Sequence, residues 1–131
     1  MDPGRFDDVA QRHGVRLLLQ FGSTVTGRAR ADSDLDLAVL LERVPATLQE
    51  HAALIGDLQG LVPDRTVDVG ILNRADPLFL KQVTTQCTLL YGALRTLHEF
   101  KMYAFRRYQD HRKYLDLERQ YVAKALSHVA R

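Results

Sequence analysis

The alternation of apolar and polar positions along the chain predicts a few short strands separated by helices. Three runs rich in Leu, Val and Ile have the length and composition of buried strands, and they span residues 15–22, 35–41 and 66–72. A shorter run at residues 88–92 is a further candidate strand. Between the second and third strands, the apolar residues of segment 46–62 recur at nearly helical spacing, which predicts a helix.

The remaining segments carry the usual signals of helix ends. Residues 5–13 predict a short helix that Gly14 closes in a left-handed cap. Asp76 and Pro77 are residue types preferred where a helix begins. Residues 94–128 contain neither Gly nor Pro and predict one long helix or two joined ones. The order of elements predicts an α/β (α+β) fold, with a small mixed β-sheet flanked by helices and a long C-terminal helix.

Two apolar stripes run along the predicted C-terminal helix. The first consists of Phe105, Tyr108, Leu115, Val122 and Val129, and the second of Tyr114, Leu117, Tyr121 and Ala125. A helix with two such stripes usually packs on both sides, and we expect the first stripe to pack on the domain's own core. We therefore divide the chain into a core at residues 1–93 and a C-terminal helical segment at residues 94–131. This segment packs on the core or on a partner, in a homodimer or a heterocomplex.

Length and composition narrow the class of protein. A chain of 131 residues has the size of one domain, and its formal net charge of +2 gives no argument for direct nucleic-acid binding. Most of the positive excess lies in residues 95–131, which form either a solvated helix face or a binding surface. The single cysteine, Cys87, fits a reducing compartment and a packing role. No apolar run approaches the roughly 20 residues that span a bilayer. We expect a cytoplasmic protein without membrane contact.

The segment with the clearest chemistry is FGSTVTGRARADSDLDLAVL, residues 21–40. Gly22 and Ser23 end one predicted strand, and after ten intervening residues Asp34 and Asp36 open the next. Side chains two apart on a strand share a face, so the two carboxylates project together while the leucines beside them turn toward the core. Neighbouring carboxylates repel each other, and a divalent cation removes that cost. Carboxylate, water and phosphate oxygens are the ligands that Mg²⁺ prefers.

A third carboxylate lies in the following predicted strand. Asp68 alternates with β-branched valines and must face the opposite way from them. If the second and third strands are neighbours, Asp68 joins Asp34 and Asp36 on one face. Three carboxylates can hold two metal ions, which stabilise the attacking and leaving oxygens of an in-line displacement at phosphorus. Asp68 can also help to take the proton from an attacking hydroxyl.

The glycine and serine upstream suit the phosphate end of a substrate. Gly22 lets the backbone approach a phosphate closely, and exposed amides together with the Ser23 hydroxyl can cradle phosphate oxygens. Arg28 and Arg30 lie in the turn that follows, where they neutralise triphosphate charge or remain on a solvated loop.

Simpler interpretations of the acidic pair remain open at this point. Two acids at a strand edge can serve only to discourage extension of the sheet. A calcium loop fits less well, because Ala38 and Leu40 stand where an oxygen ligand and a turn glycine would be needed. The five histidines show no metal-ligand spacing and are interpreted as surface or capping residues.

Together, Gly22-Ser23, Asp34-x-Asp36 and the later Asp68 resemble the signature of the DNA polymerase β-like nucleotidyltransferase superfamily. The segment GSTVTGRARADSDLDLAVL is especially similar to the minimal nucleotidyltransferases, or MNT proteins. The resemblance covers about residues 15–92. The C-terminal segment resembles, more loosely, the C-terminal helix of MNT antitoxins.

This resemblance implies a nucleotidyltransferase fold that uses ATP with Mg²⁺. It implies that Asp34 and Asp36 are catalytic metal ligands, that Asp68 is the third acid, and that Gly22 and Ser23 hold the triphosphate. Ser33 matches the small residue often found just before the acid pair. For MNT antitoxins the acceptor is a tyrosine of a partner HEPN toxin, an RNase-like helical protein. Transfer of AMP to that tyrosine, together with complex formation, silences the toxin.

Two alternative hypotheses compete with this enzymatic interpretation. The first is a non-catalytic antitoxin that neutralises its toxin by contacts alone through the C-terminal helix, whose tyrosines and arginines are types enriched at interfaces. The second keeps the chemistry but uses the hydroxyl of a small molecule such as an aminoglycoside. Only about 40 residues follow the predicted sheet, which counts against a separate acceptor domain. The nucleotide base is left open.

Overall fold

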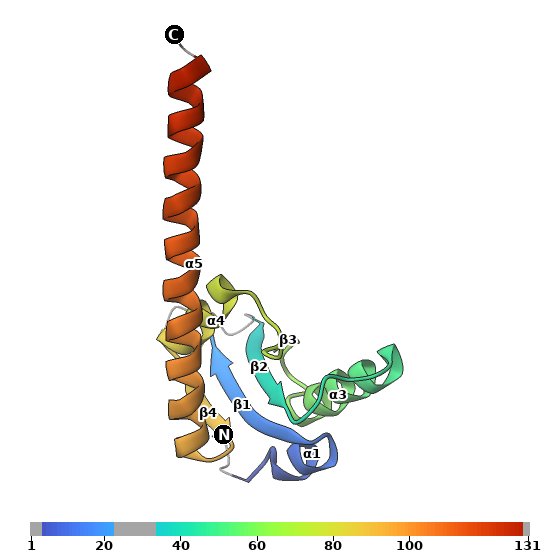
Figure 1. Ribbon diagram of the computed structural model, residues 1–131. Coiled ribbons are helices and arrows are strands. Elements are labelled where there is room, and N and C mark those ends of the chain that lie inside the picture. Colours follow the sequence, from blue (N-terminus) through green and yellow to red (C-terminus); the bar gives the residue numbers. More distant parts are fainter. Residues whose placement is uncertain (1–3, 23–33, 130–131) are drawn as a thin grey trace.

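The fold is built on a four-stranded mixed sheet, seen in a computed structural model that describes residues 4–22 and 34–129 (Figure 1). The strands are β1 (Val15–Phe21), β2 (Leu35–Leu41), β3 (Val67–Ile71) and β4 (Thr88–Tyr91), in the order β3-β2-β1-β4. β1 pairs antiparallel with both β2 and β4, whereas β2 and β3 are parallel. The predicted mixed sheet is confirmed, and the two longest strands lie at its centre.

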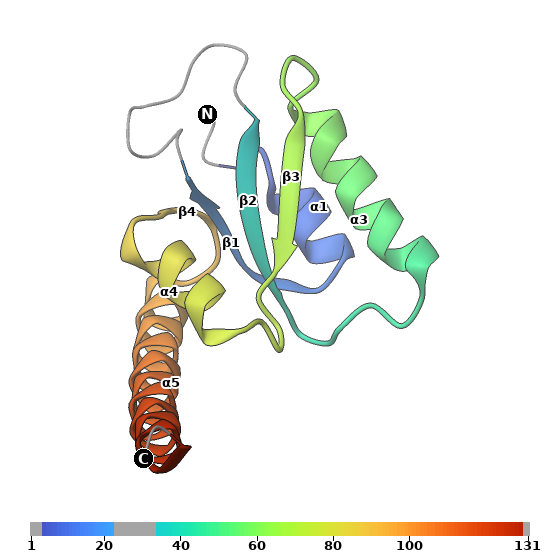
Figure 2. The same ribbon diagram turned by 90° about the horizontal axis from the view of Figure 1, so that it is seen from above.

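Within residues 4–22 and 34–129, four helices cover the two faces of this sheet. They are α1 (Asp7–Arg12), α3 (Leu48–Leu61), α4 (Pro77–Thr85) and α5 (Leu94–Val129). Seen from above, α1 and α3 lie on one side of the sheet, and α4 and α5 lie on the other (Figure 2). Each side has its own apolar core. The predicted α/β sandwich with a long C-terminal helix is therefore confirmed.

Local sequence explains where the helices begin. The Thr47 hydroxyl accepts a hydrogen bond from the Glu50 amide, and the Glu50 carboxylate accepts one from the Ala46 amide, so α3 starts with reciprocal capping bonds. The Asp76 carboxylate accepts hydrogen bonds from the amides of Leu78 and Phe79 at the start of α4. The predicted start of α4 at Asp76 and Pro77 is confirmed.

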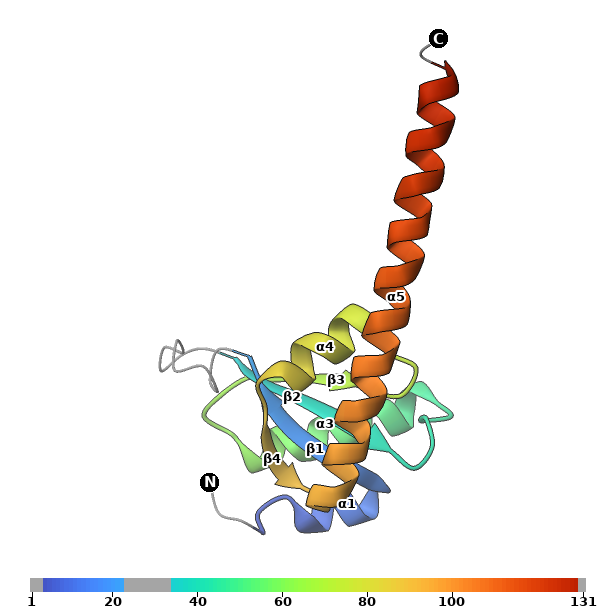
Figure 3. The same ribbon diagram turned by 60° about the vertical axis from the view of Figure 1, so that its left-hand side comes forward.

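The long helix α5 leaves the core after its first turns (Figure 3). Its buried residues are Leu97, Phe100 and Ala104, all near its start. Farther along, Val122 and Val129 of the first stripe are 46% and 80% exposed. The expectation that the first stripe packs on the domain's own core is therefore wrong for its distal part. The reason is length, since a helix of 36 residues extends for roughly 54 Å and outruns a sheet of short strands.

None of the helices in the described ranges is both long enough and apolar enough to cross a membrane.

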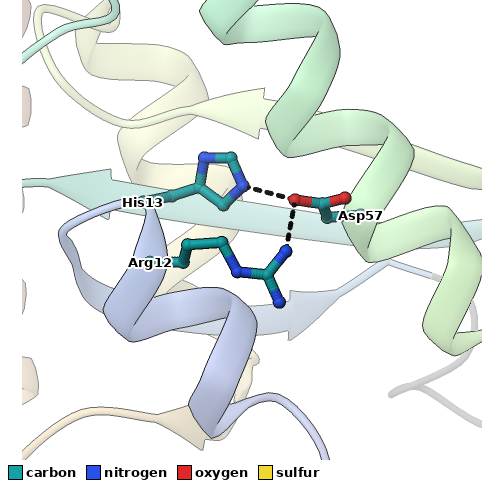
Figure 4. Close-up of polar contacts among 3 residues, drawn as sticks. All are labelled: Arg12, His13 and Asp57. Carbon is teal, nitrogen blue, oxygen red and sulfur yellow. Dashed lines mark hydrogen bonds and ion pairs between the residues drawn. The ribbon is translucent and has the colours of Figure 1, made fainter.

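On the face of the sheet opposite to α4 and α5, a small polar cluster joins α1 to α3 (Figure 4). The Asp57 carboxylate lies 2.7 Å from Nε2 of His13 and 3.2 Å from a guanidinium nitrogen of Arg12. The hydrogen bond with His13, aided by the charges of Arg12 and His13, lowers the pKa of Asp57 below its ordinary value. The folded state thus favours the charged carboxylate and holds the two helices together through it.

Replacing Asp57 by asparagine is expected to lower the melting temperature slightly at neutral pH. Because the folded-state pKa of Asp57 is depressed, its contribution is present above the ordinary value near 3.8 and is lost as the pH falls through the depressed one. Thermal unfolding of both proteins between pH 7 and pH 2 checks this. The difference should shrink at the acid end, and a constant difference across this range would contradict the assignment.

Candidate active site

The acidic pair stands where β2 begins. Asp34 immediately precedes the strand and Asp36 is its second residue. Leu35 and Leu37 are buried in the core beneath α1 and α3. Because side chains alternate along a strand, the carboxyl of Asp36 projects to the opposite face, the one covered by α4 and α5. Asp34 lies two residues earlier and shares that direction.

The third acid is brought beside the pair by strand pairing. In the parallel register of β2 with β3, Asp36 is directly opposite Asp68, and Leu35 is opposite Val67. Val67 is buried with Leu35, so Asp68 takes the same face as Asp36. The condition that made Asp68 a candidate, adjacency of the two strands, is met in the structure.

Electrostatics reflects this gathering of carboxylates. The pKa of Asp36 is raised above its ordinary value, first by burial and then by the negative charges of Asp68 and Asp34. Asp34 and Asp68 are exposed, whereas Asp36 is half-buried between strands. Asp36 is therefore the carboxylate for which a bound cation would relieve the largest penalty.

Gly22 closes the same site from the end of β1. Its φ is +81°, in the left-handed region that favours glycine. A Cβ built on Gly22 would collide with the Asp36 carboxylate, because Phe21 and Asp36 are paired across β1 and β2. The absence of a side chain here lets the backbone turn directly over the carboxylate.

An aromatic contact fixes α4 against this face of the sheet. The rings of Phe21 and Phe79 meet edge to face, with centroids 5.8 Å apart. Gly70 on β3 makes room for that contact, since a Cβ there would lie 2.6 Å from the Phe79 ring. The helix that borders the acid cluster is thereby held close to the strands that carry the acids.

A hollow of about 440 Å³ opens beside Gly22 along α4. Lys81 lines it, and its ammonium lies 3.9 Å from the centre of the Tyr108 ring on α5. A hydrogen bond from Lys81, aided by the charges of Lys81 and Arg112, lowers the pKa of the Tyr108 phenol. Sequence analysis missed Lys81, because only the packing of α4 on the sheet brings this helix to the glycine.

The donor set suits a divalent metal ion, although the side chains do not form a finished site. Within the described ranges, no group of three His, Cys, Asp or Glu side chains has the geometry to hold a metal. The residues that approach one another are nevertheless three carboxylates, and burial together with the charges of Asp68 and Asp34 raises the pKa of Asp36. Hard oxygen donors of this kind fit Mg²⁺. Ser23 and Ser33, together with Arg28 and Arg30, lie outside the described residues.

Comparison with known proteins agrees with this geometry. The sequence model of the family "Polymerase beta, Nucleotidyltransferase" matches residues 6–95. A search of curated proteins found no match. A solved structure of a candidate minimal nucleotidyltransferase is 36% identical over 67% of this chain and 95% of its own, with a TM-score of 0.54.

Two structures of complexes share the fold at lower identity. A crystal structure of a toxin-antitoxin with AMP-PNP is 24% identical and covers 97% of this chain and 99% of that one, with a TM-score of 0.73. A re-refined structure of the tri-AMPylated Shewanella oneidensis HEPN toxin with its MNT antitoxin is 23% identical over 95% of both chains, with a TM-score of 0.66. Both similarities cover nearly the whole of this chain.

Proposed function

Because this chain belongs to the polymerase β nucleotidyltransferase family, we propose that it is the antitoxin of a HEPN/MNT pair and transfers AMP from ATP to a tyrosine of its toxin. The observation that carries the proposal is the parallel register that sets Asp36 opposite Asp68 beside Gly22. An acid cluster that suits a divalent metal ion and a backbone turn at glycine then share one end of the sheet. Nucleotidyl transfer requires both.

The proposed roles follow from these positions. The Gly22 turn and Ser23 bind phosphate oxygens of ATP, with Ser33 beside the acid pair. Asp34, Asp36 and Asp68 would hold two Mg²⁺ ions. When bound, Mg²⁺ offsets the negative charge that builds up on the phosphate oxygens. The phenol oxygen attacks the α-phosphorus, the bond to pyrophosphate breaks, and Asp68 accepts the phenol proton.

The proposed partner is supported by similarity and by the exposed part of α5. The HEPN toxin in one related complex is AMPylated, and another toxin-antitoxin carries an ATP analogue. In the present chain the distal half of α5 presents a wide apolar surface to solvent, including Tyr114, Leu117 and Tyr121, which are 64%, 65% and 76% exposed. Apolar surface of this extent marks an interaction site in a soluble protein.

Mass spectrometry of the chain mixed with its HEPN partner, ATP and Mg²⁺ tests the proposal. We expect the mass of one AMP, or of several, on tyrosines of the partner, and loss of the modification when EDTA removes the metal. An unmodified partner that is still bound and inhibited would contradict the enzymatic proposal and favour the non-catalytic antitoxin. Label found only on added small hydroxyl compounds would contradict the choice of acceptor.

Removing residues 113–131 is expected to separate folding from partner binding. The buried residues of α5 end at Ala104, so the truncated protein should lose no more than about 1 kcal/mol of stability, or roughly 4 °C in melting temperature. Its affinity for the HEPN partner should fall at least tenfold, as measured by calorimetry.

Full-length variants serve as matched controls for the truncation. Leu117→Gln with Tyr121→Gln should also weaken partner binding, whereas Gln120→Ala, which lies outside both stripes, should leave it unchanged. Unaltered binding by the truncated chain would show that the distal helix is not the partner surface.

A further inference from the structure

A second cavity lies at the end of the sheet away from the three aspartates. It has a volume of about 700 Å³, and its lining includes residues that follow the last positions of β2 and β3, together with the first turns of α5. In Figure 2 this is the end where the arrows of β2 and β3 point. Because Asp36 and Leu40, a β2 residue that lines the cavity, are four residues apart at about 3.4 Å each, roughly 14 Å of strand separates the cavity from Asp36. The cavity and the acid cluster therefore lie toward opposite ends of β2.

Three arginines from three different segments line this cavity. Arg16 comes from β1, Arg43 follows β2, and Arg74 follows β3. The ion pairs found within residues 4–22 and 34–129 involve Arg12, His13 and Arg95, so none of the three cavity arginines pairs with a described carboxylate. Three guanidinium groups around one cavity create a positive potential that suits an anion able to accept several hydrogen bonds.

The backbone conformation of Arg74 indicates that its side chain serves a purpose other than folding. Arg74 has a φ of +60°, and it is the one non-glycine residue with positive φ in the described part of the chain. An L-residue in this conformation costs about 1 kcal/mol or more, which glycine would avoid. Folding alone therefore favours glycine at this turn. Arg74, which stands there instead, lines the cavity.

The rest of the lining is suited to a planar organic group. Leu40, Leu72 and Phe100 supply apolar surface, and Tyr103 packs on Phe100 with ring centroids 5.9 Å apart. Glu42 also lines the cavity and offers acceptors for N–H or O–H donors. A cavity of this volume, in which charged groups and an apolar wall face the same space, has the size of a small-molecule site.

We infer that this cavity binds a nucleoside monophosphate, with its phosphate on Arg16, Arg43 and Arg74 and its base against Phe100 and Tyr103. The carboxylate of Glu42 accepts hydrogen bonds from ribose hydroxyls or from an amino group of the base. Glu99, the other acid of the lining, is paired with Arg95 at 3.2 Å and offsets the positive potential less. This site is separate from the proposed transfer reaction and does not depend on it.

Calorimetric titration of the full chain with AMP, in EDTA and without any acceptor, tests the inference. We expect one AMP site whose affinity falls about tenfold or more in Arg43→Ala and in Arg74→Gly, since each change removes a charged hydrogen bond. Arg74→Gly should melt at the same temperature as the wild type or above it, because glycine relieves the backbone. Arg119→Ala, an exposed arginine on distal α5, is the matched control and should bind AMP normally.

Further titrations identify the ligand and test whether AMP binds at the three aspartates instead. Adenosine and inorganic phosphate should each bind at least tenfold more weakly than AMP, and Asp36→Asn should bind AMP as the wild type does. Equal binding of phosphate and AMP would reduce the cavity to an anion site and overturn the inference. Tighter binding of a 5′-phosphorylated RNA oligonucleotide would overturn it in favour of RNA. Loss of AMP binding in Asp36→Asn, or undiminished AMP binding in the arginine variants, would place AMP at the three aspartates.

Discussion

Asparagine in place of Asp36 is expected to lower AMP transfer by at least about 100-fold while leaving the protein folded. Loss of a group that merely orients a metal ligand already costs 10- to 100-fold, roughly, so loss of a central ligand should cost at least as much. The measurement is the initial rate of label transfer from ATP to the HEPN partner. Asp64→Asn, the same chemical change in an exposed loop, should transfer at the wild-type rate.

The same substitution should have the opposite effect on stability. Burial and the charges of Asp68 and Asp34 raise the pKa of Asp36, so the folded state binds a proton more tightly than the unfolded state does. The stability contributed by this carboxyl is therefore full below its ordinary pKa of 3.8 and decreases as the pH rises through the raised value. At pH 7 in EDTA, Asp36→Asn should melt at or above the wild-type temperature.

Magnesium should reverse the order of the two melting temperatures, so that the wild type melts above Asp36→Asn. An ion that binds only the folded state raises the melting temperature, and it should do so for the wild type but far less for Asp36→Asn. A variant that melts well below the wild type in EDTA would contradict the electrostatic account of Asp36. A variant that keeps full transfer activity would contradict its role as a metal ligand.

Alanine in place of Gly22 is expected to damage both the fold and the activity. The left-handed φ of +81° makes a β-carbon cost about 1–2 kcal/mol, and collision of that carbon with the Asp36 carboxylate adds to the cost. Displacement of the carboxylate or of the backbone should also abolish most transfer. Chemical denaturation gives the stability change, and the label-transfer assay gives the activity.

Gly56→Ala provides the matched control for this change. Gly56 lies inside α3, and a Cβ there would have no atom within 4 Å. The same added methyl group should therefore stabilise the protein by roughly 0.5–1 kcal/mol, through its better helix propensity, and leave transfer unchanged. Equal effects of the two substitutions would show that Gly22 has no special place in the site.

Much of the fold follows from local sequence. Segment 35–41 is the observed β2, because a run of leucines and valines bounded by polar residues has few other stable arrangements. Asp76 and Pro77 start α4 because the Asp76 carboxylate caps the helix and the fixed φ of Pro77 suits its first position, whatever the surroundings. The long helix was predicted from the lack of Gly and Pro, and α5 is continuous from Leu94 to Val129.

What each of these elements packs against depends on contacts between residues that are far apart in the sequence. Heptad spacing identified the apolar stripe of α5 but could not say what covers it, and the stripe leaves the core beyond Ala104 because the sheet is shorter than the helix. Lys81 reaches the hollow beside Gly22 only because Gly70 admits Phe79 against the strands. The cavity lined by Arg16, Arg43 and Arg74 joins three segments that no local motif connects.

The three aspartates illustrate both what local sequence determines and what only contacts between distant segments determine. The spacing of Asp34 and Asp36 is a local property, because alternation along one strand sends both carboxylates to one face. The place of Asp68 was conditional, because no local rule states which strands become neighbours. The parallel pairing of β2 with β3 sets Asp68 opposite Asp36, and the turn at Gly22 then closes over the pair. Sequence by itself determined the acids and their facing, and the tertiary structure decided that they share one site, because strand pairing depends on burial of the whole sheet.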